Sequence, residues 1–183
     1  PVLEVRGLSV SLPPRADRAN AVEDIDLEVR RREILCVVGE SGSGKSVTAQ
    51  AVMGLLPKKQ LTAVAGVVLL QGEELLGAPP ARLRELRGHR MAMIFQDPMS
   101  SLNPTMNIGS QIAETLEVHR GYSKKQAFQR AIELLDMTRI PEAAKRARQY
   151  PFEFSGGMLQ RSMIAMAIAC EPAILIADDE DSI

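Results

Sequence analysis

The sequence predicts an α/β fold, because short apolar runs that suit buried strands alternate with longer segments of helical periodicity. Three apolar runs carry this prediction, at 34–38, 91–95 and 173–177. A run that is apolar at every position suits a strand covered on both faces, as in a parallel sheet between helices. A long block of helical pattern, 107–148, follows the second run and predicts an inserted helical subdomain.

The composition excludes several other classes of protein. The 183 residues are 45% hydrophobic and 25% charged, which is typical of a globular domain and not of a disordered or disulfide-framework chain. A net charge of −1 gives no overall positive field for nucleic acid, so no nucleic-acid partner is expected. The longest apolar run, 163–170, is far shorter than the about 20 residues that span a bilayer. Cys36 and Cys170 lie in apolar stretches and are expected to be buried thiols in a reducing compartment.

The N-terminal part predicts antiparallel strands joined by a turn. Three alternating apolar runs, at 3–5, 8–12 and 25–29, are interrupted by Pro13, Pro14 and the polar segment 15–20. A helix over 45–56, a strand over 66–71 and a short charged helix over 79–87 are predicted next.

Two helix starts stand out in the second half of the chain. Ser123 and Gln126 form a capping box ahead of an apolar helical face, which contains Ala127, Ala131, Ile132, Leu134 and Leu135. A further helix is predicted over 155–170, and it opens with Gly156 and Gly157. The segment 30–32, with three arginines, is interpreted as solvated surface.

The segment 39–46 reads G-x-x-x-x-G-K-S, which is typical of a loop that binds polyphosphate. Backbone N–H groups must curl around the anion, so side chains there have to be small or absent. The loop precedes a predicted helix whose positive end adds further N–H groups. In this pattern Lys45 supplies a charge to the β- and γ-phosphates, and Ser46 supplies a hydroxyl oxygen to Mg²⁺.

Asp178 follows the apolar run 173–177 and is a candidate Mg²⁺ ligand. A carboxylate at the C-terminal end of a buried parallel strand lies at the sheet edge where phosphates bind. Many buried strands end in Asp for a turn, so this reading depends on the phosphate loop being present in the same chain.

Three further segments resemble the motifs of ABC-type ATPases. Residues 154–161, Phe-Ser-Gly-Gly-Met-Leu-Gln-Arg, resemble the signature motif. Residues 95–104 resemble the glutamine loop in the form used by importers of di- and oligopeptides and glutathione. Leu175 to Asp178 follows the signature at the distance typical of the family. The resemblance runs from Val2 to Asp178.

The resemblance implies a P-loop NTPase core of ABC type, with an antiparallel β-subdomain and an inserted helical subdomain. Within one partial ATP-binding domain, 1–183, the expected parts are a β-subdomain (1–30 and 61–76), a core (31–57, 90–96 and 158–183) and a helical subdomain (97–157). It also implies ATP and Mg²⁺ as cofactors, a second ATPase subunit (the same chain or a relative) and permease subunits as partners, and, indirectly, a substrate-binding protein. The implied location is peripheral, on the cytoplasmic face of the cell membrane.

The resemblance also assigns the site residues. The expected ATP-binding residues are Gly39, Glu40, Ser41, Gly42, Ser43, Gly44, Lys45, Ser46, Val47, Ser155, Gly156, Gly157 and Gln160. Ser155 to Gly157 are expected to hold the γ-phosphate bound to the other subunit, since a helix start offers free N–H groups. The expected metal-binding residues are Ser46, Gln96 and Asp178, and the expected catalytic residues are Gln96 and Asp179.

The sequence departs from this family at three places. Leu12 stands where an aromatic ring usually stacks on adenine, and no aromatic residue precedes Phe95. Asp179 stands where the family has a catalytic Glu, which predicts weak hydrolysis. The sequence ends at Ile183, so the C-terminal part of the core is expected to be missing, with buried strand edges left unpaired.

The leading functional prediction is the ATP-binding and ATP-hydrolysing subunit of an ABC importer for peptides, weakly active or inactive as this chain alone. One alternative is a truncated, catalytically weak or silent fragment that binds nucleotide weakly or only associates with partners. Another is a soluble ABC ATPase without a transport role, which the near-neutral charge and the form of the 95–104 loop argue against.

Overall fold

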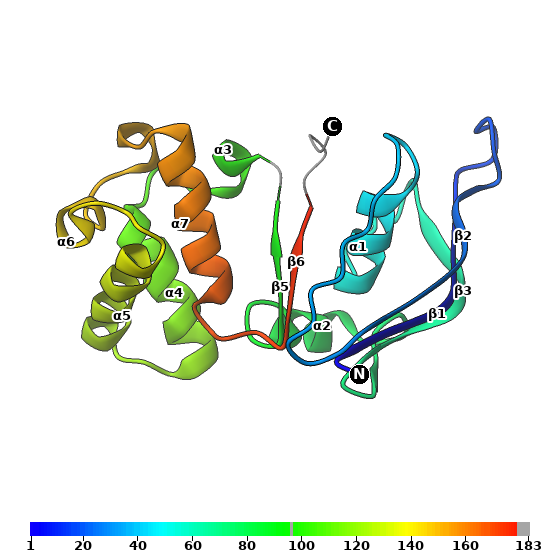
Figure 1. Ribbon diagram of the computed structural model, residues 1–183, viewed down its shortest axis with the longest axis horizontal. Helices are drawn as coiled ribbons and strands as arrows, with labels where there is room; N and C mark the ends of the chain where they lie inside the picture. The colour runs from blue at the N-terminus through cyan, green and yellow to red at the C-terminus, as the bar shows by residue number, and fades with distance from the viewer. Residues whose placement is uncertain (96, 179–183) are drawn as a thin grey trace. The chain divides into compact units, whose positions relative to one another are not determined.

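The computed structural model describes residues 1–95 and 97–178, with Pro98 described in its backbone only. The chain forms two compact units, residues 1–84 and 85–183 (Figure 1). Across the described residues, no helix combines the length and apolar content that crossing a bilayer requires.

The first unit contains an antiparallel sheet in the order β2-β1-β3-β4. Its strands are β1 (Leu3–Ser11), β2 (Asn20–Val29), β3 (Thr62–Leu70) and β4 (Glu73–Glu74). The predicted antiparallel strands are confirmed, although the first two apolar runs belong to one strand that continues through Gly7 at φ +58°. Gly66 lies so close to β1 that an added Cβ would be 2.5 Å from Cα of Leu8, which explains a glycine in the strand.

Of the first two helices along the chain, one lies within this unit and the other crosses its boundary at residue 84. Helix α1 (Lys45–Met53) begins after Gly44 and ends at Gly54, both in the left-handed conformation, so it is shorter than the predicted 45–56. It buries Ala51, Val52 and Met53. Helix α2 (Pro80–Leu86) forms within the predicted 79–87.

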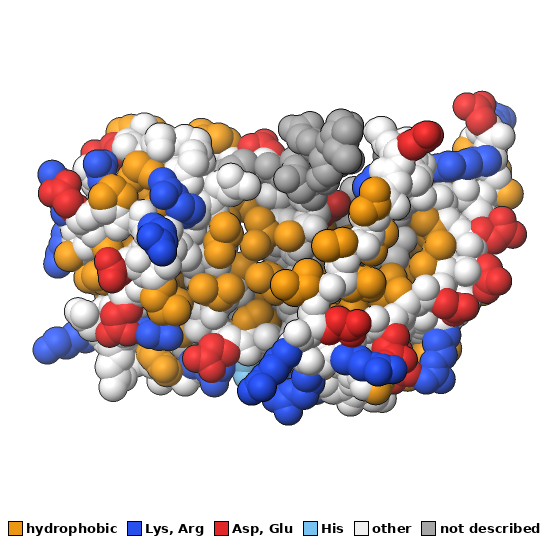
Figure 2. Space-filling view, viewed as in Figure 1, with side chains coloured by type: hydrophobic (Ala, Val, Ile, Leu, Met, Phe, Trp, Pro, Cys, Tyr) orange, Lys and Arg blue, Asp and Glu red, His pale blue; other side chains and the backbone are white. Residues whose placement is uncertain are grey.

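The prediction of a buried strand over 34–38 is wrong. No strand of the described residues pairs with this segment, and Ile34 and Val38 are 91% and 86% exposed. Cys36 is exposed, so its predicted burial is wrong as well. An apolar run records a tendency to be buried, but a strand also needs a hydrogen-bonding neighbour, and the described part of the chain supplies none here. Hydrophobic side chains reach the surface on the face that Figure 2 shows.

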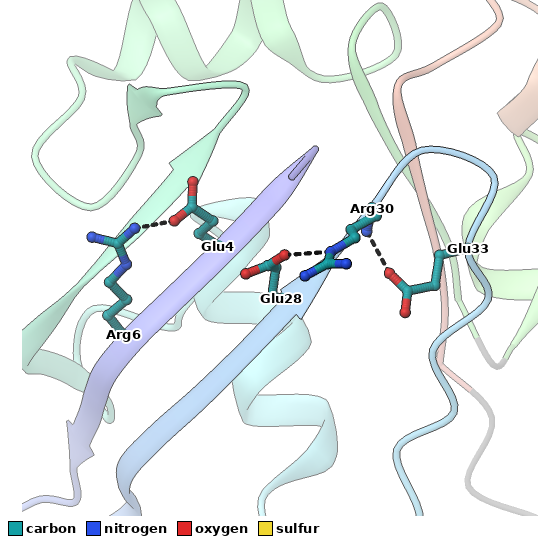
Figure 3. Close-up of polar contacts among 5 residues, drawn as sticks. All are labelled: Glu4, Arg6, Glu28, Arg30 and Glu33. Atoms are coloured by element: carbon teal, nitrogen blue, oxygen red, sulfur yellow. Dashed lines mark hydrogen bonds and ion pairs between the residues drawn. The ribbon is translucent and has the colours of Figure 1, made fainter.

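Exposed ion pairs follow the neighbouring ends of β1 and β2 (Figure 3). Arg30 Nε donates to the Glu28 carboxylate at 2.8 Å, and this hydrogen bond lowers the pKa of Glu28 below its usual value. The Glu33 carboxylate accepts the backbone N–H of Arg30 at 2.6 Å, and Arg6 pairs with Glu4. All three arginines at 30–32 are exposed, which confirms their interpretation as solvated surface. Such exposed pairs contribute little to the free energy of unfolding.

The second unit holds two parallel strands, β5 (Met91–Ile94) and β6 (Ile174–Ala177). Their register pairs Met91 with Ile174 and Ile94 with Ala177, so both strands end at the same edge. The predicted parallel pairing is therefore confirmed for these two runs. The prediction that 173–177 is buried is wrong, because Leu175 is 41% exposed and β5 is the one described neighbour of β6.

Helices form the core of the second unit. They are α3 (Pro98–Ser101), α4 (Ile108–Arg120), α5 (Lys124–Met137), α6 (Ala143–Arg146) and α7 (Gly156–Ile168), with a 3₁₀ turn η1 (Pro151–Glu153) before α7. Buried side chains of α4, α5 and α7 join one hydrophobic cluster, which includes Ile112, Leu116, Leu134, Leu135 and Leu159. The capping box of Ser123 and Gln126 is present, and Cys170 is buried, as predicted.

The two histidines meet in this unit, at the turn before β5 and at the end of α4. The rings of His89 and His119 stack with centroids 6.4 Å apart. Burial lowers the pKa of His119 below its usual value, and the neighbouring charge of His89 acts in the same direction.

Candidate functional site

The predicted phosphate loop leads directly into α1. Residues 39–43 are exposed, and the chain turns where Ser43 N donates to the carbonyl oxygen of Glu40 at 3.1 Å. No side chain caps the start of α1, so the amides of its first turn, which includes Lys45, Ser46 and Val47, extend the loop with backbone donors. A triphosphate can bind at such a helix start because N–H groups and the helix dipole favour an anion.

Glycine is required at Gly44 for two separate reasons. Its φ of +95° is a conformation that L side chains rarely adopt. An added Cβ would lie 2.2 Å from Cγ1 of Val22 and 3.0 Å from the carbonyl oxygen of Ala21. The loop is therefore seated directly on the start of β2, which fixes where α1 begins.

The side chain of Lys45 reaches back along the loop. Its Nζ donates to the carbonyl oxygens of Gly39, at 2.6 Å, and Glu40, at 3.0 Å. These described partners are neutral carbonyls rather than carboxylates, so the positive charge stays available for an anion at the loop. The hydroxyl of Ser46 lies in the first turn of α1, beside this ammonium in sequence.

Arg18 is a contact that the sequence analysis missed. Its Nη2 donates to the carbonyl oxygen of Gly42 at 2.9 Å, across 24 residues of sequence. Arg18 lies in the exposed loop between β1 and β2, which was interpreted only as a polar turn. No sequence spacing predicts which partner a single arginine in a loop will bind, so the hydrogen bond between Arg18 and Gly42 is seen only in the folded structure.

The second unit carries the predicted signature segment at the start of α7. Ser155 is the N-cap, and its side chain accepts from the backbone N–H of Met158 at 3.4 Å. Gly156, Gly157 and Gln160 are exposed, and nothing lies within 4 Å of a Cβ added to either glycine. Phe154 is 8% exposed and anchors the segment in the hydrophobic core of this unit. The N-terminus of α7 is therefore open at its two glycines, while the residue before its N-cap is held in the hydrophobic core.

Asp178 directly follows β6. Its backbone N–H donates to the carbonyl oxygen of Ile94 at 3.2 Å, so the pairing with β5 continues to this residue. Asp178 is half-buried at the edge where the two parallel strands end. The two predicted catalytic residues, Gln96 and Asp179, lie outside the described residues.

The structure brings together the predicted residues of the first unit and places those of the second unit at two separate elements. In the first unit Gly39 to Val47 form one continuous loop and helix start, joined by Arg18. In the second unit Ser155 to Gly157 form the start of α7, and Asp178 lies at the end of β6.

Several known proteins are similar to this chain. The family model described as "ABC transporter" matches residues 22–181. The chain is 47% identical, over 98% of its length, to the putative peptide import ATP-binding protein BMEII0863 of Brucella melitensis, of which it covers 54%. It is 48% identical, over 98% of its length, to the oligopeptide transport ATP-binding protein OppD of Haemophilus influenzae, of which it covers 55%. The chain therefore spans about half the length of these curated relatives.

Two solved structures show the same fold. The dimeric structure of a post-hydrolysis state of the ATP-binding cassette MJ0796, bound to ADP and Pi, has a TM-score of 0.84 at 24% identity. That match covers 98% of this chain and 75% of the other. A second dimeric structure of MJ0796 has a TM-score of 0.81 at 24% identity and covers 96% of this chain and 73% of the other.

Proposed function

This chain belongs to the ABC transporter family, and we propose that it is the ATP-binding part of a subunit whose ATP hydrolysis drives the import of peptides. The observation that carries the proposal is the loop of Gly39 to Ser46, which ends at an uncapped helix start and holds the Lys45 ammonium over its own carbonyls. The names of the relatives from Brucella melitensis and Haemophilus influenzae support peptides as the transported substrate.

In the proposed complex, the backbone amides of the loop and of the first turn of α1 bind the phosphates of ATP. The Glu40, Ser41 and Ser43 side chains belong to exposed positions of this loop, so it can close on the anion without displacing core residues. Lys45 transfers its hydrogen bonds from the Gly39 and Glu40 carbonyls to the β- and γ-phosphates.

Mg²⁺ is proposed as the accompanying cation from the family resemblance, because this hard cation takes oxygen ligands, such as a serine hydroxyl or an aspartate carboxylate, together with substrate phosphates. We assign Ser46, Asp178 and Gln96 to this ion. When bound, Mg²⁺ neutralises charge on the phosphates. From the family resemblance, Gln96 and Asp179 are proposed as the residues that act on the attacking water.

A second ATPase subunit is proposed to complete the site. The open N-terminus of α7, with Ser155, Gly156 and Gly157, offers backbone donors to the γ-phosphate held by the other subunit, and Gln160 lies one turn further on. The solved neighbours are described as dimeric, which supports this arrangement. The proposed partners also include permease subunits and, through them, a substrate-binding protein. The proposed location is peripheral, on the cytoplasmic face of the cell membrane.

The test is calorimetric titration of the chain with MgATP, with Lys45→Ala as the variant and Lys59→Ala as the matched control. Lys59 is an exposed lysine of the same unit, in the turn after α1. We expect Lys45→Ala to weaken binding at least about tenfold, since it removes a charge-assisted contact, and Lys59→Ala to leave it unchanged. Equal affinities for all three proteins, or no binding by the unaltered chain, would overturn the proposal.

A further inference from the structure

Arg18 binds the phosphate loop at the carbonyl oxygen of Gly42. In the peptide unit between Gly42 and Ser43, the N–H of Ser43 donates to the Glu40 carbonyl oxygen, on the loop's own turn. The carbonyl of the same trans peptide points the opposite way, and it is this oxygen that accepts from Arg18 Nη2 at 2.9 Å. Lys45, by contrast, reaches the carbonyl oxygens of Gly39 and Glu40. The two cations therefore bind different carbonyls of one loop.

The segment that carries Arg18 is held against the loop at a second point. Leu12 N donates to the Ala19 carbonyl oxygen at 2.9 Å, which closes the connection between β1 and β2. Just beyond it, Val22 and Ala21 pack against Gly44, so closely that no Cβ fits there. Arg18 is therefore held near the loop by the packing of Ala21 and Val22 against Gly44 as well as by its own hydrogen bond.

The first unit contains no aromatic ring with which a nucleotide base could stack. All Phe and Tyr residues lie at position 95 or later, and the chain has no Trp. A guanidinium is the other planar group that stacks on aromatic faces, and arginine planes stack on bases in this way. The Arg18 side chain is exposed, and its bond to Gly42 uses one of its five N–H donors. Because this hydrogen bond lies in the guanidinium plane, a face of the guanidinium can still stack on the base of a nucleotide.

We propose that Arg18 is a base-contacting residue of the nucleotide site, which stacks its guanidinium on the base while its hydrogen bond to Gly42 holds it beside the phosphate loop. This inference rests on the proposed function, because it needs a nucleotide whose phosphates lie on Gly39 to Ser46. Arg18 would add a contact with the base to a loop that otherwise binds only the phosphates.

The experiment separates the base from the phosphates by using two ligands, MgATP and magnesium tripolyphosphate, which lacks both base and sugar. Calorimetric affinities are measured for the unaltered chain and for Arg18→Ala, Arg18→Lys and Arg15→Ala. Arg15→Ala is the matched control, because it removes the same charge from the same exposed loop. Circular dichroism of each variant checks that the sheet is intact.

We expect Arg18→Ala to weaken MgATP about five- to tenfold, as the loss of a stacked cation does. Its effect on tripolyphosphate should be no larger than that of Arg15→Ala. Arg18→Lys keeps the charge but not the planar group, so it should recover less than half of the lost affinity on a logarithmic scale.

Four results would overturn the inference. If Arg18→Ala weakens both ligands equally, the residue only positions the phosphate loop, and if Arg18→Lys binds MgATP like the unaltered chain, a point charge is sufficient. Failure of the unaltered chain to bind either ligand would refute the proposed function itself, and the inference with it. Binding of tripolyphosphate with normal MgATP affinity in Arg18→Ala would refute the inference alone.

Discussion

Gly44 and Val22 are packed so closely that the only side chain the loop accepts at position 44 is a hydrogen atom. This contact joins the phosphate loop to β2 and so connects two parts of the sequence that carry separate patterns. It gives a direct test of how the loop is held.

Gly44→Ala is expected to destabilise the chain by about 2–4 kcal/mol, the sum of a left-handed alanine and an overpacked contact with Val22. Gly42→Ala is the control, because Gly42 also has a positive φ, of +79°, but has nothing within 4 Å of an added Cβ. Its cost should be only the conformational part, about 1 kcal/mol. Denaturant unfolding measures both, and equal losses would show that the packing against Val22 contributes nothing.

Ser123→Ala is expected to lower the free energy of unfolding by about 1 kcal/mol, because it removes the capping box at the start of α5. Ser123 Oγ accepts from Gln126 N at 3.3 Å, and the Gln126 side chain accepts from Ser123 N at 3.1 Å. Lys124→Ala, at the adjacent exposed position, should change stability by less than about 0.5 kcal/mol. Thermal unfolding followed by far-ultraviolet circular dichroism makes the comparison. A Ser123→Ala variant as stable as Lys124→Ala would contradict the assignment.

Acid is expected to destabilise the second unit through His119. Its pKa is lowered by burial and by His89, so the unfolded chain binds the proton more readily than the folded one. The contribution of His119 to the free energy of unfolding should therefore be fully present above the usual histidine pKa of 6.5. It should decrease as the pH falls through and below that value. His119→Gln should flatten this decrease in unfolding experiments between about pH 7 and 5. An unchanged pH profile in the variant would assign the decrease to other groups.

The two thiols are expected to differ in reactivity. Cys36 is exposed, whereas Cys170 is buried and burial raises its pKa. Iodoacetamide at neutral pH should therefore modify Cys36 first and Cys170 only after denaturation, because the thiolate is the reactive form. Mass spectrometry of peptides after timed alkylation gives both rates. Slow labelling of Cys36 in the folded chain would show that the segment 34–38 is covered in solution.

Asp179→Glu is expected to increase ATP turnover. The aspartate carboxylate is shorter by about one C–C bond than the glutamate of the family, and a misplacement of roughly 1 Å can cost on the order of 10²-fold in rate. Steady-state phosphate release by a subunit that carries the rest of the ATPase measures the gain. Asp179→Asn, which removes the charge, should reduce the rate further. The same rate for aspartate and glutamate would remove the argument for weak hydrolysis.

Local patterns predicted much of this structure. The capping box, the loop of 39–46 and the antiparallel strands of the N-terminal part follow from residues that are near one another in the sequence. The segment 34–38 was predicted wrongly, because a strand depends on a neighbour that periodicity does not contain. Arg18 could not be predicted for a related reason, since its partner Gly42 lies 24 residues away and arginine in a turn has many possible roles.

The placement of aromatic residues gives this chain an uneven optical signal. Both tyrosines and all four phenylalanines belong to the second unit, and there is no tryptophan. Tyrosine fluorescence and near-ultraviolet circular dichroism therefore observe residues 85–183, whereas the peptide signal in the far ultraviolet observes both units. Melting curves recorded with the two probes coincide only if the units unfold together. A tryptophan introduced into β2 would give the unit with the phosphate loop a fluorescence signal of its own. That fluorescence could then report nucleotide binding directly.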